Sequence, residues 1–131
     1  MNRYFLMPSV FESFKKSLER LREVVRMEPT LVQRDSAIQR FEVTYELAWK
    51  SLQKYLREKG VSAFTPRDCF MEAFRIGLIQ DDTQWIEMGR DRNLTAHTYN
   101  ETLAEQVYGR IGGYVALFDV IREKLEQAKN E

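Results

Sequence analysis

Apolar residues recur at spacings of three and four along most of the chain, which is the period of one face of an α-helix. The first apolar stripe follows Ser9 and consists of Phe11, Phe14, Leu18, Leu21 and Val25. The second stripe consists of Ile38, Phe41, Tyr45, Ala48, Leu52 and Tyr55. Pro29 is the expected start of the second helix, because proline is favoured in the first turn of a helix, and Gly60 is its expected C-terminal cap.

Two shorter helices are predicted in the middle of the chain. Thr65 and Pro66 fit an N-cap and a first helical residue, and this helix is expected to reach about Gly77. Its apolar positions are Phe70, Ala73 and Phe74. Asp81, Asp82 and Thr83 fit the cap of a fourth helix, whose first apolar residues are Trp85, Ile86 and Met88.

A long final helix completes the predicted architecture. Thr98 and Glu101 have the spacing of a capping box, in which a Thr caps the helix three residues before a Glu. The apolar stripe that follows consists of Leu103, Val107, Ile111, Tyr114, Phe118, Ile121 and Leu125. No segment alternates apolar and polar residues as a strand would. The sequence therefore predicts a single all-α domain over residues 1–131, an up-and-down helical bundle with three long and two short helices.

Three glycines interrupt the last helix, and each lowers helix stability by about 1 kcal/mol relative to Ala. They are Gly109, Gly112 and Gly113. One explanation is that the missing side chains let a neighbouring helix of the same chain pack closely. The alternatives are a hinge, a kink or the close approach of a partner subunit.

Composition narrows the possible functions. The chain has 131 residues with 20 basic and 20 acidic side chains, so no overall field attracts nucleic acid, and any RNA contact must use a local patch. The first helix carries a basic strip of Lys15, Lys16, Arg20, Arg22 and Arg26, but the interleaved Glu12, Glu19 and Glu23 favour a solvated face.

Without an apolar run near 18 residues or a signal-peptide pattern, we expect a cytoplasmic protein with no membrane contact. One cysteine and one histidine give no metal-ligating cluster, so no metal and no cofactor are expected.

The chemistry of the chain concentrates between Arg92 and Tyr99, a segment that contains its one histidine, His97. Arginine matches phosphate, and histidine transfers protons near neutral pH. In a continuous helix the two side chains would point roughly 140° apart. They can converge only if the helix ends near Ala96, or if two copies meet across a symmetric dimer. The alternative is structural, with Arg92 paired to Asp91, Glu87 or another carboxylate and His97 satisfying carbonyl groups at a helix end.

Two glutamates one turn apart, Glu42 and Glu46, lie in an otherwise apolar part of the second helix. They are candidates for lining a dimer cleft or for orienting Arg92. The alternative is an exposed face with ion pairs such as Glu46 to Lys50, each worth about 0.2–0.5 kcal/mol. The pattern leaves both interpretations open.

Three motifs in order resemble one protein family. They are residues 40–52 (RFEVTYELAWKSL), Pro66-Arg67-Asp68 with Glu72-Ala73-Phe74-Arg75, and residues 91–99 (DRNLTAHTY). Together they are similar to the nucleotidyltransferase substrate-binding protein family, part of the HEPN superfamily of helical bundles. The likeness covers about residues 8–127.

The resemblance implies a fold, partners and site residues. It implies a homodimer or higher even oligomer that pairs with a separately encoded minimal nucleotidyltransferase, often as a toxin–antitoxin module. It implies a metal-independent site for RNA cleavage at Arg92 and His97 across the dimer, with Asn93 as the polar residue after the Arg. In related toxins the Tyr two places after the His accepts AMP from the partner enzyme, and that position here is Tyr99.

The sequence leaves alternatives to a nuclease open. The chain lacks the Gly-Ser and paired-Asp pattern of a nucleotidyltransferase, so it is not expected to transfer nucleotides itself. It is either an RNase whose activity the partner restrains, or a non-catalytic subunit that binds a nucleotide or other substrate and oligomerises. A blander alternative is a helical oligomerisation module with a relic motif.

Overall fold

The computed structural model describes residues 9–80 and 83–129 and consists of helices, with no strand in those ranges. The α-helices are α1 (Val10–Val25), α2 (Leu31–Glu58), α3 (Pro66–Arg75), α4 (Thr83–Leu94) and α5 (Glu101–Lys129), with a short 3-10 turn, η2 (Thr95–His97), between α4 and α5. The prediction of an all-α bundle with three long and two short helices is confirmed. The predicted cap residues Asp81 and Asp82 lie outside the described ranges.

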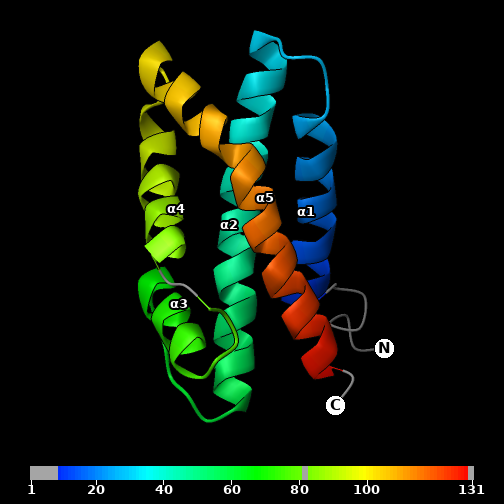
Figure 1. Cartoon of the computed structure of the whole chain (residues 1–131), viewed down its shortest axis with the longest axis vertical. Coiled ribbons are helices and arrows are strands. Elements are labelled where there is room, and N and C mark those ends of the chain that lie inside the picture. The colour runs from blue at the N-terminus through cyan, green and yellow to red at the C-terminus, as the bar shows by residue number, and fades with distance from the viewer. Residues whose placement is uncertain (1–8, 81–82, 130–131) are drawn as a thin grey trace, which may run out of the picture.

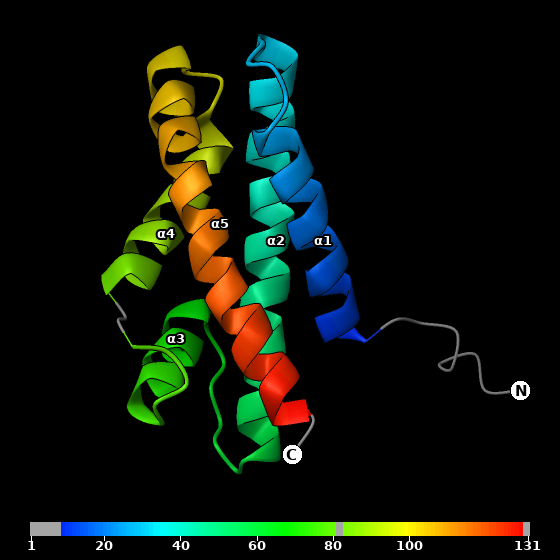
Figure 2. The ribbon, with the colours of Figure 1, turned by 45° about the vertical axis from the view of Figure 1, so that its right-hand side comes forward.

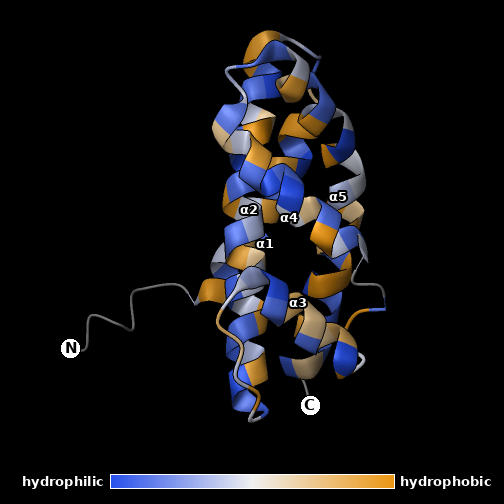
Figure 3. Ribbon diagram, turned by 90° about the vertical axis from the view of Figure 1, so that its left-hand side faces the viewer, coloured by the Kyte–Doolittle hydropathy of each residue, from blue (hydrophilic) through white to orange (hydrophobic). Residues whose placement is uncertain are grey.

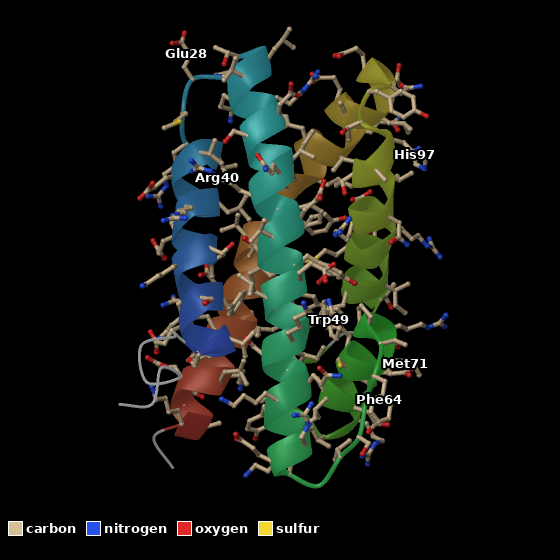
Figure 4. The ribbon with its side chains drawn as sticks, turned by 180° about the vertical axis from the view of Figure 1, so that it is seen from behind. Glu28, Arg40, Trp49, Phe64, Met71 and His97 are labelled. Carbon is tan, nitrogen blue, oxygen red and sulfur yellow. The ribbon has the colours of Figure 1, made fainter. Side chains whose placement is uncertain are left out.

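Helix α2 is the centre of the bundle, with α1 on one side and α3 and α4 in succession along the other (Figures 1 and 2). Helix α5 crosses one face of α2, and no other described helix covers the opposite face, as Figure 4 shows from behind. In a side view, α3 lies in line below α4, and both alternate hydrophilic and hydrophobic residues (Figure 3). None of the described helices is both long and apolar enough to cross a membrane.

Aromatic rings fill the core between these helices. Phe41 of α2 stacks on Tyr114 of α5 with ring centroids 5.5 Å apart, and Phe70 of α3 stacks on Trp85 of α4 at 4.8 Å. Phe118 of α5 contacts both groups, with its centroid 6.3 Å from Phe41 and 6.0 Å from Trp85. The apolar stripes read from the sequence therefore meet in one cluster.

Two helix starts differ from the sequence prediction. Helix α2 begins at Leu31 with Thr30 as its cap, because the Thr30 hydroxyl accepts from the Gln33 amide at 3.0 Å; Pro29 lies before the helix. Helix α5 is capped by Asn100, whose side-chain carbonyl oxygen accepts from the Leu103 amide at 3.1 Å. Thr98 is not the cap, because its hydroxyl donates to the Thr95 carbonyl at 3.1 Å.

Helix α3 is slightly shorter than predicted. It ends at Arg75, and Gly77 follows in the left-handed conformation with φ +82°, which favours glycine. Cys69, Phe70 and Ala73 are its buried residues, whereas Phe74, the third of its apolar positions in the sequence, is 45% exposed. A helix at the edge of the bundle buries one row of residues, and Phe74 lies outside that row.

The glycines of α5 do not serve packing within the chain. Helix α5 runs without interruption through Gly109, Gly112 and Gly113, and all three are exposed. Among the residues that the structure describes, a Cβ atom added at any of them would meet nothing within 4 Å. The first explanation, close packing of a neighbouring helix of the same chain, is therefore wrong. The approach of a partner subunit stays a prediction.

Candidate functional site

The predicted site residues lie at the end of α4 and in the turn that leads to α5. Arg92 and Asn93 belong to the last turn of α4, His97 ends the 3-10 turn η2, and Tyr99 precedes α5. The α-helix thus ends at Leu94, three residues before His97. His97 therefore lies beyond the α-helix, as convergence of the two side chains within one chain would require.

Arg92 is held by two carboxylates of α2. Its Nε atom donates to Glu46 Oε1 at 3.2 Å, and its Nη1 atom lies 3.9 Å from Glu42 Oε2. Nη1 also donates to the Thr95 hydroxyl at 3.1 Å. Glu46 in turn accepts from the indole of Trp49 at 3.0 Å. The carboxylate partners of Arg92 therefore come from 46 and 50 residues earlier in the chain, not from Asp91 or Glu87.

His97 and Tyr99 form a second, separate cluster at the surface. The Tyr99 hydroxyl lies 3.5 Å from His97 Nδ1, and the rings meet edge to face with centroids 6.0 Å apart. Both residues are exposed, Tyr99 to 82%. Among the described residues, no hydrogen bond joins this cluster to Arg92. Within one chain, the structure brings Arg92 to the glutamates and His97 to Tyr99, but it does not bring the two clusters into contact.

An ion pair between the buried Asp91 and Arg110 fixes α4 to α5 behind Arg92. The Asp91 carboxylate, 3% exposed, accepts two hydrogen bonds of 2.7 Å from Arg110. It also accepts from the Tyr114 hydroxyl, and burial together with this bond raises the pKa of Tyr114 above its ordinary value. Bidentate pairs of this kind are among the strong hydrogen bonds in proteins. Asp91 thus points toward α5, while the next residue, Arg92, faces α2 and is partly exposed.

Sequence reasoning missed this pair. Its partners Arg110 and Tyr114 lie 19 and 23 residues after Asp91 in the chain. From the sequence, Asp91 was considered only as an ion-pair partner of the adjacent Arg92. The available signal was that Asp91 falls three residues after Met88, at a spacing where α4 places buried residues. An acidic residue at such a position needs a buried cation or donor.

A pocket of about 630 Å³ adjoins Arg92 between α2, α3 and α4. Arginines line its rim: Arg67 from α3 and Arg90 and Arg92 from α4. Its other lining residues include Glu46, Asn93 and the aromatic Tyr45, Phe70 and Trp85. Arg67 and Arg90 are exposed and form no ion pair with any described carboxylate, so they leave the pocket with uncompensated positive charge.

Tyr45 forms part of the floor of this pocket. Burial raises the pKa of its phenol to about 12, so the side chain is neutral under ordinary conditions. The sequence motif around Pro66 had already drawn attention to Arg67, but without a role, and Arg90 carried no signal. A pocket lined by both arginines and aromatic rings suits an anionic ligand that carries a ring. The described residues contain no group of three His, Cys, Asp or Glu side chains that could hold a metal ion.

Comparison with known proteins adds the family. Residues 9–127 match the family described as nucleotidyltransferase substrate binding protein like. The chain belongs to this family. The resemblance inferred from the three motifs is thereby confirmed.

One related protein and two solved structures are similar to this chain in sequence. A Haemophilus influenzae protein named Probable ribonuclease HepT is 34% identical over 109 residues, which are 77% of this chain and 75% of that protein. A crystal structure from Thermus thermophilus is 40% identical with a TM-score of 0.82, over 86% of this chain and 98% of the other. A Haemophilus influenzae structure, reported as the fold of a substrate binding domain of a nucleotidyltransferase, is 31% identical with a TM-score of 0.68, over 89% and 94%.

A more distant structure shares the fold. One chain of a toxin–antitoxin crystal structure with AMP-PNP has a TM-score of 0.71 over 91% of this chain and 99% of its own length. Its identity is 16%, so this likeness concerns the arrangement of helices alone. All of these neighbours agree with the all-α bundle of the nucleotidyltransferase substrate-binding family.

Proposed function

We propose that this chain is the HEPN-type partner of a separately encoded minimal nucleotidyltransferase, and that its homodimer cleaves RNA through Arg92 and His97. The observation that carries the proposal is the exposed pair of His97 and Tyr99, 3.5 Å apart, at the end of the helix that presents Arg92. The similarity to a protein named Probable ribonuclease HepT supports the same function.

The site is incomplete in one chain, which favours a dimer. Arg92 and His97 lie in separate clusters here, and a two-fold axis near the end of α4 would bring Arg92 of one copy toward His97 of the other. The proposed dimer therefore has a composite cleft, with each copy contributing part of it.

The chemistry needs no metal, because RNA carries its own nucleophile. A His97 imidazole takes the proton of a 2′-hydroxyl, whose oxygen then attacks the adjacent phosphorus atom. The bond to the 5′-oxygen breaks, and the second His97 of the dimer supplies the proton for that leaving group. General acid–base catalysis of this kind contributes about 10²–10⁴-fold. Arg92 binds the non-bridging phosphate oxygens and stabilises the charge that builds on them.

Tyr99 is the proposed point of control. Its 82% exposure leaves the phenol accessible to a partner enzyme. The Tyr99 oxygen attacks the α-phosphorus of ATP, pyrophosphate leaves, and the phenol proton is released. The product places a negative phosphodiester and a nucleoside beside His97, where they compete with RNA for Arg92.

Two measurements test the proposal. The purified dimer is incubated with RNA in EDTA, and we expect cleavage that His97→Ala lowers by about 10²–10⁴-fold. Gln106→Ala, an exposed residue on α5, is the control and should cleave like the parent protein. Mass spectrometry after co-expression with the neighbouring nucleotidyltransferase should find a mass gain of one or more AMP units, absent in Tyr99→Phe. Equal cleavage by His97→Ala and the parent protein contradicts the nuclease.

A second candidate function is nucleotide binding without catalysis. The observation in its favour is the pocket of about 630 Å³, which Arg92 and Asn93 line but His97 does not. Calorimetry with ATP separates the two functions. If the pocket is the functional site, Arg67→Ala and Arg90→Ala weaken ATP binding, whereas His97→Ala leaves it unchanged.

A further inference from the structure

A second cationic site lies in a groove between α1 and α2, which we call the α1–α2 groove. It has a volume of about 430 Å³, and its basic lining residues are Lys16 and Arg20 from α1 and Arg40 from α2. Ser13 and Gln39 add polar groups to its walls, and no acidic residue lines it. Lys16 and Arg20 are exposed, so the groove is open to ligands from solvent.

The structure divides the basic strip of α1 into two sets. Lys15 and Arg22 face α5, where Lys15 pairs with Glu126 at 3.4 Å and Arg22 pairs with Asp119. Lys16 and Arg20 instead face α2, where Arg40 adds a third positive charge to the groove. Among the described residues, no carboxylate lies within 4 Å of a charged nitrogen of Lys16, Arg20 or Arg40. The interleaved glutamates that favoured a solvated face therefore do not neutralise this half of the strip.

Arg40 is fixed in the groove by the backbone of the facing helix. Its Nη1 atom donates to the Arg20 carbonyl at 2.7 Å. Beneath it, the Thr44 hydroxyl donates to the Arg40 carbonyl at 2.7 Å and bonds to the buried Ser17 hydroxyl at 2.6 Å. A guanidinium has five N–H donors, so most of those on Arg40 are free to bind a ligand. Three like charges held together in a chain of zero net charge repel one another, and a bound anion relieves that repulsion.

The groove lies on the same exposed face of α2 as the site at Arg92. Figure 4 shows this face between α1 and α4, with Arg40 toward α1 and His97 at the far side, on the α4 edge. Val43, which lines the groove on the α2 side, is 48% exposed. A helix with side chains is about 10–12 Å across, so a strand of a few nucleotides reaches from one site to the other.

We infer that the α1–α2 groove binds backbone phosphates of the RNA that is cleaved at the composite site. The choice of RNA rests on the proposed function, while the presence of an anion site rests on the groove itself. Guanidinium and hydroxyl donors match phosphate oxygens, and they read no base, so the groove adds affinity and direction without sequence preference.

The test measures binding of a fluorescein-labelled, single-stranded 12-nucleotide RNA by anisotropy. All variants carry His97→Ala, so that the RNA stays intact. Lys16→Gln with Arg20→Gln should weaken binding about tenfold at 0.1 M salt and reduce the slope of log K against log salt by about 1.4, which is 0.7 for each lost contact. The control, Arg57→Gln with Lys124→Gln, removes two exposed cations outside the groove and should bind like the parent protein.

The outcomes separate this inference from the proposed function. If the slope of log K against log salt is unchanged in the Lys16/Arg20 variant, and its melting temperature is unchanged, the groove does not bind the RNA. This conclusion holds even if the wild-type protein cleaves RNA. A reduced slope with no cleavage by the wild-type protein supports the groove and contradicts the nuclease. Equal displacement of the RNA by a heptaglutamate peptide would show a general site for acidic chains and overturn the assignment to phosphate.

Discussion

Asp91 and Arg110 form a two-pronged ion pair, with both N–H···O distances at 2.7 Å, in which the carboxylate is buried and the guanidinium reaches solvent. This pair and the Tyr114 hydroxyl fix the last turn of α4 against α5. Because Arg92 directly follows Asp91, the same contact sets the direction in which Arg92 leaves the bundle. The candidate site therefore depends on a structural ion pair that takes no part in its chemistry.

Removing the cation of this pair should destabilise the fold strongly. Arg110→Ala leaves the buried Asp91 carboxylate with Tyr114 as its remaining side-chain partner, and we expect a loss of about 3 kcal/mol in the free energy of unfolding. Arg90→Ala, which removes an exposed arginine of α4, should change it by less than about 0.5 kcal/mol. Urea unfolding followed by circular dichroism measures both. Equal stability of the two variants would contradict the importance of the pair.

Glu46 is expected to act as a positioning residue for Arg92. Arg92→Ala should lower RNA cleavage by about 10²–10³-fold, as for loss of other groups that stabilise transition-state charge. Glu46→Ala leaves Arg92 without its nearest carboxylate and should lower cleavage less, whereas Glu46→Gln keeps an acceptor 3.2 Å away and should recover most of the activity. Lys50→Ala on the same helix is the control. Failure of Glu46→Gln to exceed Glu46→Ala would show that Glu46 does not act through a hydrogen bond.

A composite site makes a prediction about mixtures of inactive variants. Dimers formed from equal amounts of Arg92→Ala and His97→Ala chains contain one intact pair in each mixed dimer. Half of the dimers are mixed and each holds one of two pairs, so a quarter of wild-type cleavage is the upper limit. Because a mixed dimer also lacks the second His97 that protonates the leaving group, we expect cleavage below that limit but clearly above that of either variant alone. A site formed within one chain would recover nothing, since every chain in the mixture lacks one of the two residues.

The stability of the fold should fall at high pH because of Tyr45. Burial raises the pKa of its phenol to about 12 in the folded chain, against an unfolded value near 10. A raised pKa favours the protonated folded state. The contribution of Tyr45 to the free energy of unfolding is therefore complete below pH 10 and is lost as the pH rises from 10 to 12. Tyr45→Phe removes the titrating group, and its free energy of unfolding should fall less steeply over that interval. Urea unfolding at pH 9, 10 and 11 makes the comparison, and identical slopes would contradict it.

The sequence predicted the helices well because each long helix buries a regular stripe. Phe41 and Phe118 are examples, since their spacing within α2 and α5 alone places them in the core. The start of α5 was less predictable, because both Thr98 and Asn100 were candidates for its cap. The outcome depended on which side chain was free to accept a hydrogen bond from a backbone amide.

The site was predictable as a set of residues but not as an arrangement. Arg92, His97 and Tyr99 stood out because of their chemistry and their order. The partnership of Arg92 with Glu46 spans 46 residues and depends on how α4 packs beside α2, which no local pattern contains. The anion groove was hidden for the same reason: Lys16 and Arg20 lie among glutamates in the sequence, and only the packing of α1 turns those glutamates away.

The glycines of α5 give a prediction that tests the surface of the bundle. Gly112→Ala and Gly113→Ala add a Cβ atom that meets nothing within 4 Å, so each should stabilise the isolated chain by up to about 1 kcal/mol through helix propensity. Gly77→Ala is the contrasting control, because its φ of +82° strains any residue with a Cβ atom and should lower stability by about 1–2 kcal/mol. Thermal unfolding at two protein concentrations decides the outcome. If instead the alanines lower the melting temperature and raise its dependence on concentration, the glycine face lies against a partner subunit, and the helix keeps its glycines for that contact.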